Sequence, residues 1–224
     1  LTAPKAAASI DAGVIWMGRR SFFIYSGGAV TEIPCEVGDY VFSDMNNDQR
    51  SKIAAIPNSQ WNEIWWFYPS NGSTECDRYV VYDYVENIWT IGQLDRTSGV
   101  DSGVFRDPLW VDADGDVFEH EIGNTYSGGT PFAETGPIAI GAGDRLMRVT
   151  SLIPDEKTQG DVTAKFKTRF YPNASETEHG PFTMSNPTDV RFTGRQVRMS
   201  VEGPRSADWR VGIMRIEAKA GGKR

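Results

Sequence analysis

The feature that most constrains the fold is a repeated pattern of two short apolar strands joined by a polar turn. In "RYVVYDYVENIWTIG", residues 79–82 and 88–91 flank a turn at 84–87. The arms "PLWVD" and "VFEHEI" repeat this plan, and "GVIWM", "RSFFIYS" and "AVTEIP" form a further series joined by tight turns. Aromatic and β-branched residues favour strands, whereas Gly, Asn and Asp favour the turns between them. The pattern predicts an all-β protein.

Such hairpins, with aromatic residues near the strand ends and no long helices, are typical of β-propeller blades. Residues 14–33, 61–92 and 104–122 are predicted to form three partial-propeller blades. Propellers have about 4–8 blades, so three are too few to close a ring. Because the chain begins at Leu1 and not at Met, we expect it to be trimmed or part of a longer protein that supplies earlier blades. An irregular sandwich built from the same hairpins is the alternative.

Three regions follow from composition. Residues 1–124 form the propeller-like region, with one short helix predicted where Val37, Tyr40, Val41 and Met45 have helical spacing. Residues 125–136 are rich in Gly, Thr and Pro and are predicted to be a connector. In residues 137–224 the strands lengthen, which predicts an antiparallel β-sandwich or platform-like domain.

Alternation within the longer strands assigns side chains to faces. In "TAKFKTRF", Lys165, Lys167 and Arg169 share one face, and Ala164, Phe166 and Phe170 share the other. "TDVRFTGRQVRMSVEG" is predicted to be one of these strands, and "DWRVGIMRIEAKA" is another.

The last of these strands also shows alternation. Trp209, Val211 and Ile213 are predicted to face the core, and Arg210 to face solvent or a neighbouring subunit. A core Trp at this position would make Trp209→Ala cost about 3–5 kcal/mol.

The charge of the chain is divided unevenly. Residues 1–124 hold 8 Lys and Arg and 19 Asp and Glu, a balance of −11, and residues 125–224 hold 15 and 11, a balance of +4, which together give −7. The cationic face with Lys165, Lys167 and Arg169 has three interpretations: a solvated sheet face, a nucleic-acid contact, or a contact with the acidic surface of a neighbouring subunit. The opposite signs of the two regions favour the subunit contact over direct DNA binding, and Arg210 is a further candidate for it.

The carboxylates of "DADGD" have the alternate spacing of a calcium loop. An EF-hand that began at Asp112 would need Gly at its sixth position and Glu at its twelfth, where this chain has Val117 and Gly123. A hairpin explains the segment better, with Asp114 and Gly115 in a type I′ turn and Val111 opposite Phe118. We therefore expect Asp112, Asp114 and Asp116 to bind no calcium.

No catalytic constellation is visible in the sequence. His120 lies in a predicted strand, His179 lies in a predicted loop, and neither belongs to a nucleophile elbow or a metalloprotease motif. Cys35 and Cys76 are too few for a zinc site and are predicted to be separate buried thiols. We expect no enzymatic activity, no metal and no cofactor, although a pair of carboxylates for glycoside cleavage stays open because the fold sets their spacing. The longest apolar runs are too short to span a membrane.

"NEIWWFYPS" followed by "DRYVVYDYVENIWTIG" resembles a segment of the tail tubular protein B, or tail nozzle, family of short-tailed bacteriophages. The runs "RFYPNASETEHGPF", "FTGRQVRMSVEG" and "DWRVGIMRIEAKAGGKR" resemble the closing portion of such proteins. The resemblance covers most of the chain from about residue 14. The packaged-DNA-stabilisation proteins of other short-tailed phages are similar as well.

The resemblance implies a structural virion protein, made in the cytoplasm of a bacterial host. Identical subunits, six in the expected ring, would form a nozzle at the distal tail beside the adaptor or tube proteins and the fibres. The ring would seal the genome channel and let DNA pass on ejection, with transient contact only. An acidic lining from the −11 region would repel phosphates at short range.

A carbohydrate-binding or glycan-hydrolysing β-propeller is the rival hypothesis, because the seven Trp could serve as sugar platforms. Trp65 and Trp66, however, are predicted to be strand residues that point to opposite faces. An exposed aromatic cleft beside two carboxylates would favour this rival.

Overall fold

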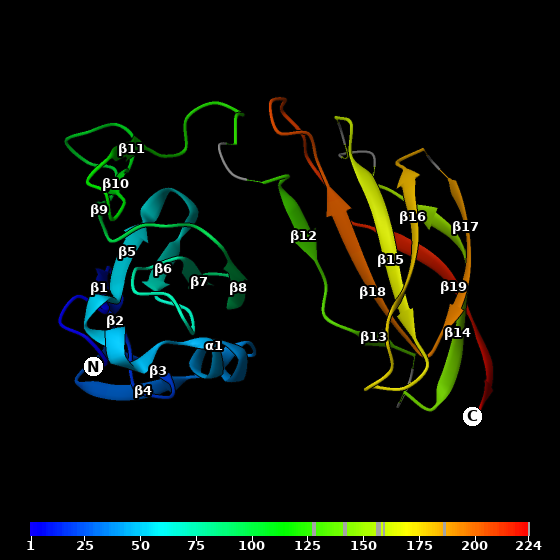
Figure 1. Ribbon diagram of the computed structural model, residues 1–224, viewed down its shortest axis with the longest axis horizontal. Helices are drawn as coiled ribbons and strands as arrows, with labels where there is room; N and C mark the ends of the chain where they lie inside the picture. Colours follow the sequence, from blue (N-terminus) through cyan, green and yellow to red (C-terminus); the bar gives the residue numbers. More distant parts are fainter. Residues whose placement is uncertain (127–128, 141–142, 156–157, 159, 186, 224) are drawn as a thin grey trace. The chain divides into compact units, whose positions relative to one another are not determined.

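The computed structural model describes residues 1–126, 129–140, 143–155, 158, 160–185 and 187–223. The chain divides into two compact units, Leu1–Ile122 and Gly123–Arg224, which we call the first and second unit. All strands within the sheets pair in antiparallel fashion (Figure 1). The prediction of an all-β protein is confirmed.

The first unit contains three antiparallel meanders, in which neighbouring strands in the sequence pair with one another. The first sheet comprises β1 (Ala7–Ile10), β2 (Gly13–Met17), β3 (Phe22–Ser26) and β4 (Ala29–Ile33). The second sheet comprises β5 (Ala54–Asn58), β6 (Glu63–Tyr68), β7 (Arg78–Asp83) and β8 (Ile88–Gly92). The third sheet comprises β9 (Ser98–Val100), β10 (Leu109–Val111) and β11 (Val117–Glu119).

Each sheet begins earlier than the predicted ranges 14–33, 61–92 and 104–122, because each has an additional first strand. The three strands that the sequence pattern missed are weak strand formers: β1 contains two Ala, β5 contains Pro57, and β9 is three residues long with a central Gly. Pro lacks a backbone donor, so it is tolerated where β5 pairs only with β6 at the edge of its sheet.

The segment between the first two sheets holds the predicted helix. It contains α1 (Gly38–Asp44), followed by a short 3₁₀ helix at Asn47–Lys52, and a second 3₁₀ turn lies at Ser59–Trp61. Val41 and Met45 are buried, as the helical spacing predicted, whereas Tyr40 is exposed.

The three sheets stack face to face, with the second sheet in the middle. Its Trp66 is fully buried and packs against Phe22 of the first sheet, with ring centroids 4.9 Å apart. On the opposite face, Trp65 and Phe67 pack against Trp110 of the third sheet at 5.2 and 5.5 Å. The prediction that Trp65 and Trp66 point to opposite faces is confirmed.

The first strands of the three sheets also lie next to one another. The strand β5 lies beside both β1 and β9. Just before β1, the backbone carbonyl of Lys5 accepts a hydrogen bond from the Ala55 N–H at 2.8 Å. The three meanders are therefore arranged in chain order around their first strands.

The hairpin at the "DADGD" segment exists, but its predicted geometry is wrong by one residue. Val111 pairs with Val117 and Trp110 pairs with Phe118, and only Gly115 has a positive φ, of 91°. The reason is the Asp112 side chain, whose Oδ1 accepts hydrogen bonds from the N–H groups of residues 114 and 116 at 3.0 and 2.9 Å. These bonds hold a longer loop than a two-residue type I′ turn.

The second unit contains two antiparallel sheets that enclose one core. One sheet has the order β12-β18-β15-β16, with β13 also paired to β18, and the other has the order β17-β14-β19. Figure 1 shows them as two layers. Their strands are β12 (Phe132–Glu134), β13 (Ile138–Ala139), β14 (Arg145–Ile153), β15 (Thr163–Arg169), β16 (Thr177–Thr183), β17 (Thr188–Gly194), β18 (Gln196–Glu202) and β19 (Arg215–Lys223).

The core of the second unit combines residues from both layers. Phe166 of β15 packs against Phe192 of β17 with ring centroids 4.7 Å apart, and Val149 and Val201 are buried with them. Ala164 is also buried, as its predicted face required, but β15 ends at Arg169 and Phe170 is exposed.

Two segment assignments in this unit are wrong. The predicted connector 125–136, whose residues 127 and 128 lie outside the described part, includes β12, which pairs with β18. The segment predicted as one strand at 188–203 is broken at Arg195, since β17 and β18 belong to different sheets. Gly194 permits this crossing because a Cβ there would lie 2.8 Å from Thr168 Cβ. In both cases tertiary pairing, and not local composition, decides the structure.

Trp209 also departs from its predicted strand. β19 begins only at Arg215, so Trp209 precedes it, and Ile213, expected in the core, is exposed. Trp209 is half-buried against the core, with its indole ring over Gly203. A Cβ on Gly203 would lie 2.2 Å from the Trp209 ring, which is well inside van der Waals contact.

We therefore expect Gly203→Ala to displace the Trp209 ring and lower the free energy of unfolding by about 1–3 kcal/mol, as overpacking does. Gly136→Ala is the matched control, because a Cβ there meets no atom within 4 Å. Denaturant unfolding of both variants, followed by Trp fluorescence, measures the difference. Equal stability of the two variants would contradict the packing of Trp209 on Gly203.

Candidate interaction surfaces

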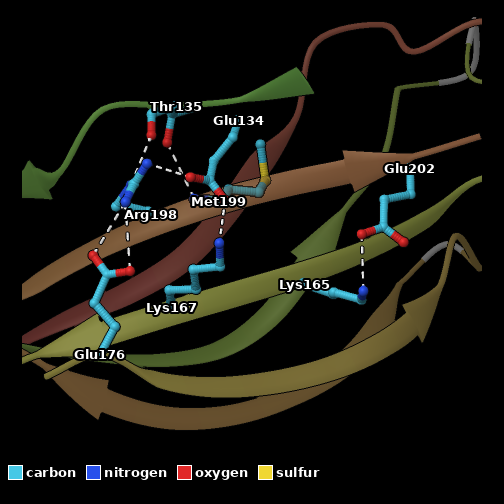
Figure 2. A network of polar contacts seen from close by, with 8 residues as sticks. All are labelled: Glu134, Thr135, Lys165, Lys167, Glu176, Arg198, Met199 and Glu202. Atoms are coloured by element: carbon cyan, nitrogen blue, oxygen red, sulfur yellow. Dashed lines mark hydrogen bonds and ion pairs between the residues drawn. The ribbon is translucent and has the colours of Figure 1, made fainter. Parts of the chain in front are cut away.

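The predicted cationic face of β15 lies on the solvent side of its sheet, but carboxylates from other strands neutralise it. Lys165 Nζ donates to Glu202 Oε1 at 2.8 Å, and this hydrogen bond raises the pKa of Lys165. Lys167 Nζ lies 2.6 Å from Glu134 Oε2 (Figure 2). Glu178 is the partner of Lys167 in the β15–β16 register.

Glu134 is the central residue of this network. In the sheet register Lys167 lies opposite Arg198, so two positive charges face each other across the strands. One carboxylate oxygen of Glu134 bonds Lys167 and the other bonds Arg198, which also pairs with Glu176 at 3.3 Å (Figure 2). The Glu134 side chain is only 13% exposed, so water screens these contacts weakly.

The strand that carries Glu134 is held in place by its neighbour Thr135. The Met199 N–H donates to Thr135 Oγ1 at 3.1 Å, and the Thr135 N–H donates to the Met199 carbonyl at 2.9 Å. Arg198 Nε also donates to the Thr135 carbonyl at 3.3 Å. These bonds fix β12 against β18 and direct Glu134 between the two cations.

The four candidate contact residues do not form one free cationic patch. Lys165 and Lys167 are paired with carboxylates of the same chain, and Arg169 Nε donates to the neutral amide oxygen of Gln196 at 2.6 Å. Arg210 is exposed and belongs to a different segment. The face of β15 is thus a charge-balanced sheet surface, and a contact made by these residues with DNA or with a subunit stays a prediction.

Removing the charge of Glu134 should leave Lys167 and Arg198 facing each other without the carboxylate between them, with Arg198 still paired to Glu176. We expect Glu134→Gln to lower the free energy of unfolding by about 1–2 kcal/mol, since like charges directly opposite in a sheet destabilise it and charged hydrogen bonds contribute more than neutral ones. Glu202→Gln, which affects the single Lys165 pair, should cost under about 1 kcal/mol. Urea unfolding at low and high salt measures both. A larger loss in Glu202→Gln would contradict the central role of Glu134.

A second surface lies at one end of the first unit, where strand ends and loops of all three sheets bring acidic residues together. Trp61 and Asn58 donate to Glu121 at 2.9 and 3.1 Å, and the Trp65 indole donates to Glu63 at 2.8 Å. We call the following carboxylates the acidic rim: Asp11, Glu63, Asp83, Asp101 and Glu121.

Perturbed pKa values connect the members of the acidic rim. Burial raises the pKa of Glu63, and the nearby charges of Glu121 and Asp83 raise it further. Burial also raises the pKa of Tyr84, with added contributions from Asp11, Asp101 and Asp83. Glu63 and Tyr84 are therefore each close to negatively charged side chains of this group.

The sequence contained only part of the signal for this rim. The balance of −11 in residues 1–124 indicated an acidic region, but its members are far apart in the chain, from residue 11 to residue 121. Only the stacking of the three sheets brings their loops together.

His120 is a half-buried residue that packs against Trp110 and Arg96. Its ring stacks on Trp110 with centroids 4.0 Å apart, and its Nε2 accepts a hydrogen bond from Arg96 Nε at 3.0 Å. Arg96 is itself buried, and its guanidinium lies 3.9 Å from the ring centroid of Phe118. Burial, and then the Arg96 charge, lower the pKa of His120 to about 4.

This cluster predicts that the protein begins to lose stability at a pH well above the pKa of ordinary carboxylates. The folded-state pKa of His120 lies below its ordinary value of 6.5, so the unfolded chain binds the extra proton first. Stability from His120 is fully present above pH 6.5 and is lost as the pH falls from 6.5 towards about 4. Melting temperatures across this window should fall less steeply in His120→Gln, which keeps an acceptor for Arg96 without titrating. An unchanged slope in that variant would contradict the prediction.

The two cysteines are free thiols in different surroundings. Cys76 is buried, and burial raises its pKa to about 12. Cys35 is only half-buried, contrary to the prediction that both are buried, and burial raises its pKa to about 11. Burial therefore favours the protonated form of both thiols at neutral pH.

Among the described residues, no group of three or more His, Cys, Asp or Glu side chains is arranged to hold a metal ion. No helix in the described part of the chain has the length and apolar character needed to cross a membrane.

The chain matches no model of a known protein family. No curated protein matches it either.

Proposed function

We propose that this chain is a structural subunit of a bacteriophage tail nozzle, in which a ring of identical subunits encloses the genome channel. The observation that carries the proposal is the stack of three antiparallel meanders around adjacent first strands, which is how propeller blades are arranged. In this proposal the three sheets are blades and the second unit is the platform-like domain. The role is structural and not catalytic.

The outer faces of the first and third sheets carry apolar residues that further blades would cover. On the outer face of the first sheet, Trp16 stacks on Phe23 at 5.7 Å, and Tyr25 and Val30 beside them are exposed. The outer face of the third sheet exposes Val100 and Val117. Apolar sheet faces of this kind are buried in a closed propeller, where each blade packs between two others.

The acidic rim supports a channel through which DNA passes without tight binding. Its carboxylates come from all three sheets, and burial, with smaller contributions from the charges of Glu121 and Asp83, raises the pKa of Glu63. A surface of this sign repels phosphates once they approach within about 8 Å at physiological salt. The expected hexamer, the neighbouring adaptor, tube and fibre proteins, and a location in the virion belong to the same proposal.

One observation favours the rival, a carbohydrate-binding or glycan-hydrolysing propeller. Trp61 is 53% exposed and its indole bonds Glu121, so an aromatic platform lies beside a carboxylate. Among the described residues, however, Trp61 does not line the hollow beside Cys35 or the hollow beside Phe170. Sugar sites need a concave surface as well as a platform.

Electron microscopy of the purified chain tests the proposal directly, with sedimentation to measure the oligomeric state. Rings of six-fold symmetry are the expected result. Binding to a glycan array that is lost in Trp61→Ala, with the chain remaining monomeric, would overturn the nozzle in favour of the rival. Trp16→Ala is the matched control for loss of an aromatic residue away from the acidic rim.

A further inference from the structure

The outer face of the sheet β17-β14-β19 carries two opposed cations. Arg148 of β14 lies directly opposite Lys219 of β19 in the sheet register. The residues on either side of Arg148 in the chain, Met147 and Val149, are buried in the core of the second unit, so Arg148 points away from that core. Both Arg148 and Lys219 are exposed. We call Arg148 and Lys219 the cationic pair.

Positive charge continues from the cationic pair towards the start of β14. Arg145 is the first residue of this strand and is also exposed, and Lys223 is its partner in the register with β19. Two of the register positions shared by β14 and β19 therefore join an Arg with a Lys. The carboxylate nearest in sequence is Asp144, which precedes the strand.

The cationic pair has no carboxylate partner in its own sheet. In the other sheet, Glu134 neutralises the opposed cations, but among the residues that the structure describes neither member of the cationic pair forms an ion pair. Two carboxylates of this face, Asp189 and Glu217, lie further along the sheet, both opposite Ser151, and Asp189 pairs with Arg191 at 3.4 Å. Like charges directly opposite each other destabilise a sheet, so this face is suited to an anion supplied from outside the chain.

The residues around the cationic pair favour phosphate groups over a protein surface as that anion. Thr193 lies opposite Arg148 on the β17 side, and Thr150 is two residues further along β14. Arg, Lys, Ser and Thr side chains are typical donors to the phosphate oxygens of DNA. Centres of protein interfaces are instead rich in aromatic residues. None of the exposed side chains that the structure describes in β14, β17 and β19 is aromatic.

We propose that the cationic pair binds phosphate groups in the backbone of double-stranded DNA, without reading its sequence. Single strands are less suitable, since proteins bind them by stacking bases on aromatic side chains. The whole chain carries −7 and repels DNA at a distance, so the contact is weak and acts only within about 8 Å at physiological salt. The inference goes beyond the proposed ring, because it assigns a DNA contact to the second unit whether or not subunits assemble.

The test is the salt dependence of binding between the whole chain and a short labelled DNA duplex, measured by fluorescence anisotropy. Two phosphate contacts predict a slope of about −2 for the logarithm of affinity against the logarithm of salt, or about a tenfold loss between about 50 and 200 mM. Arg148→Ala and Lys219→Ala should each weaken binding and reduce this slope by about 1. Arg106→Ala is the matched control, because Arg106 is a 95% exposed arginine of the first unit and its loss changes the net charge equally.

A charge reversal separates loss of binding from loss of folding. Arg148→Glu places a carboxylate opposite Lys219, so this variant should be at least as stable as the unchanged chain in urea unfolding. Its binding to the duplex should nevertheless fall further than that of Arg148→Ala. Reduced binding in a variant of equal or greater stability cannot result from unfolding.

The other outcomes decide between the possible anions. If the unchanged chain does not bind the duplex at low salt, or if Arg148→Glu binds it equally well, the inference is wrong. If polyglutamate displaces the labelled duplex as effectively as unlabelled duplex does, the face recognises acidic protein and the inference is overturned. If the chain binds the duplex through the cationic pair but forms no rings in the electron microscope, the DNA contact stands and the proposed ring does not.

Discussion

The burial of aromatic side chains on both faces of the second sheet is the constraint on which the first unit depends. Successive residues of β6 point to opposite sides, so Trp66 faces the first sheet and Trp65 and Phe67 face the third. A sheet that is apolar on both faces cannot leave either one in water, because each buried aromatic residue contributes several kcal/mol, roughly 3–5, to stability. The neighbouring sheets must therefore stack on it, and the acidic loops at their ends must meet.

This constraint also explains which parts of the fold the sequence could predict. "EIWWFY" shows its two apolar faces through period-2 alternation alone, and the hairpins show their turns. The strands β1, β5 and β9 could not be found in this way, because Ala, Pro57 and Gly give them little intrinsic preference and only pairing with a stronger neighbour makes them strands. Trp209 was misassigned for a related reason: alternation suits a strand, but its ring packs over Gly203 outside one.

The charge of the candidate surfaces could likewise be predicted only in part from the sequence. Alternation correctly placed Lys165 and Lys167 on one solvent-facing side of β15, but it could not show their partners. Glu134 lies in a segment whose composition is that of a connector, and only the β12–β18 pairing brings it between Lys167 and Arg198. Alternating cations in a sequence therefore describe the face of one strand only. The electrostatic potential of a sheet surface depends on the register of all its strands.

The charged side chains of the two units are arranged differently, and this difference bears on the proposed channel. In the second unit, Lys165, Lys167 and Arg198 pair with carboxylates, which makes the β15 face suitable for contact with other surfaces or with solvent. In the first unit, burial raises the pKa of Glu63, and the nearby charges of Glu121 and Asp83 add to this shift. Repulsion of this kind is short-ranged, about 8 Å at physiological salt, so it acts on DNA inside a narrow channel and hardly at all on DNA outside it. In the proposed nozzle, a lining with these properties would keep a packaged genome from adhering to the wall and would add little resistance to its passage.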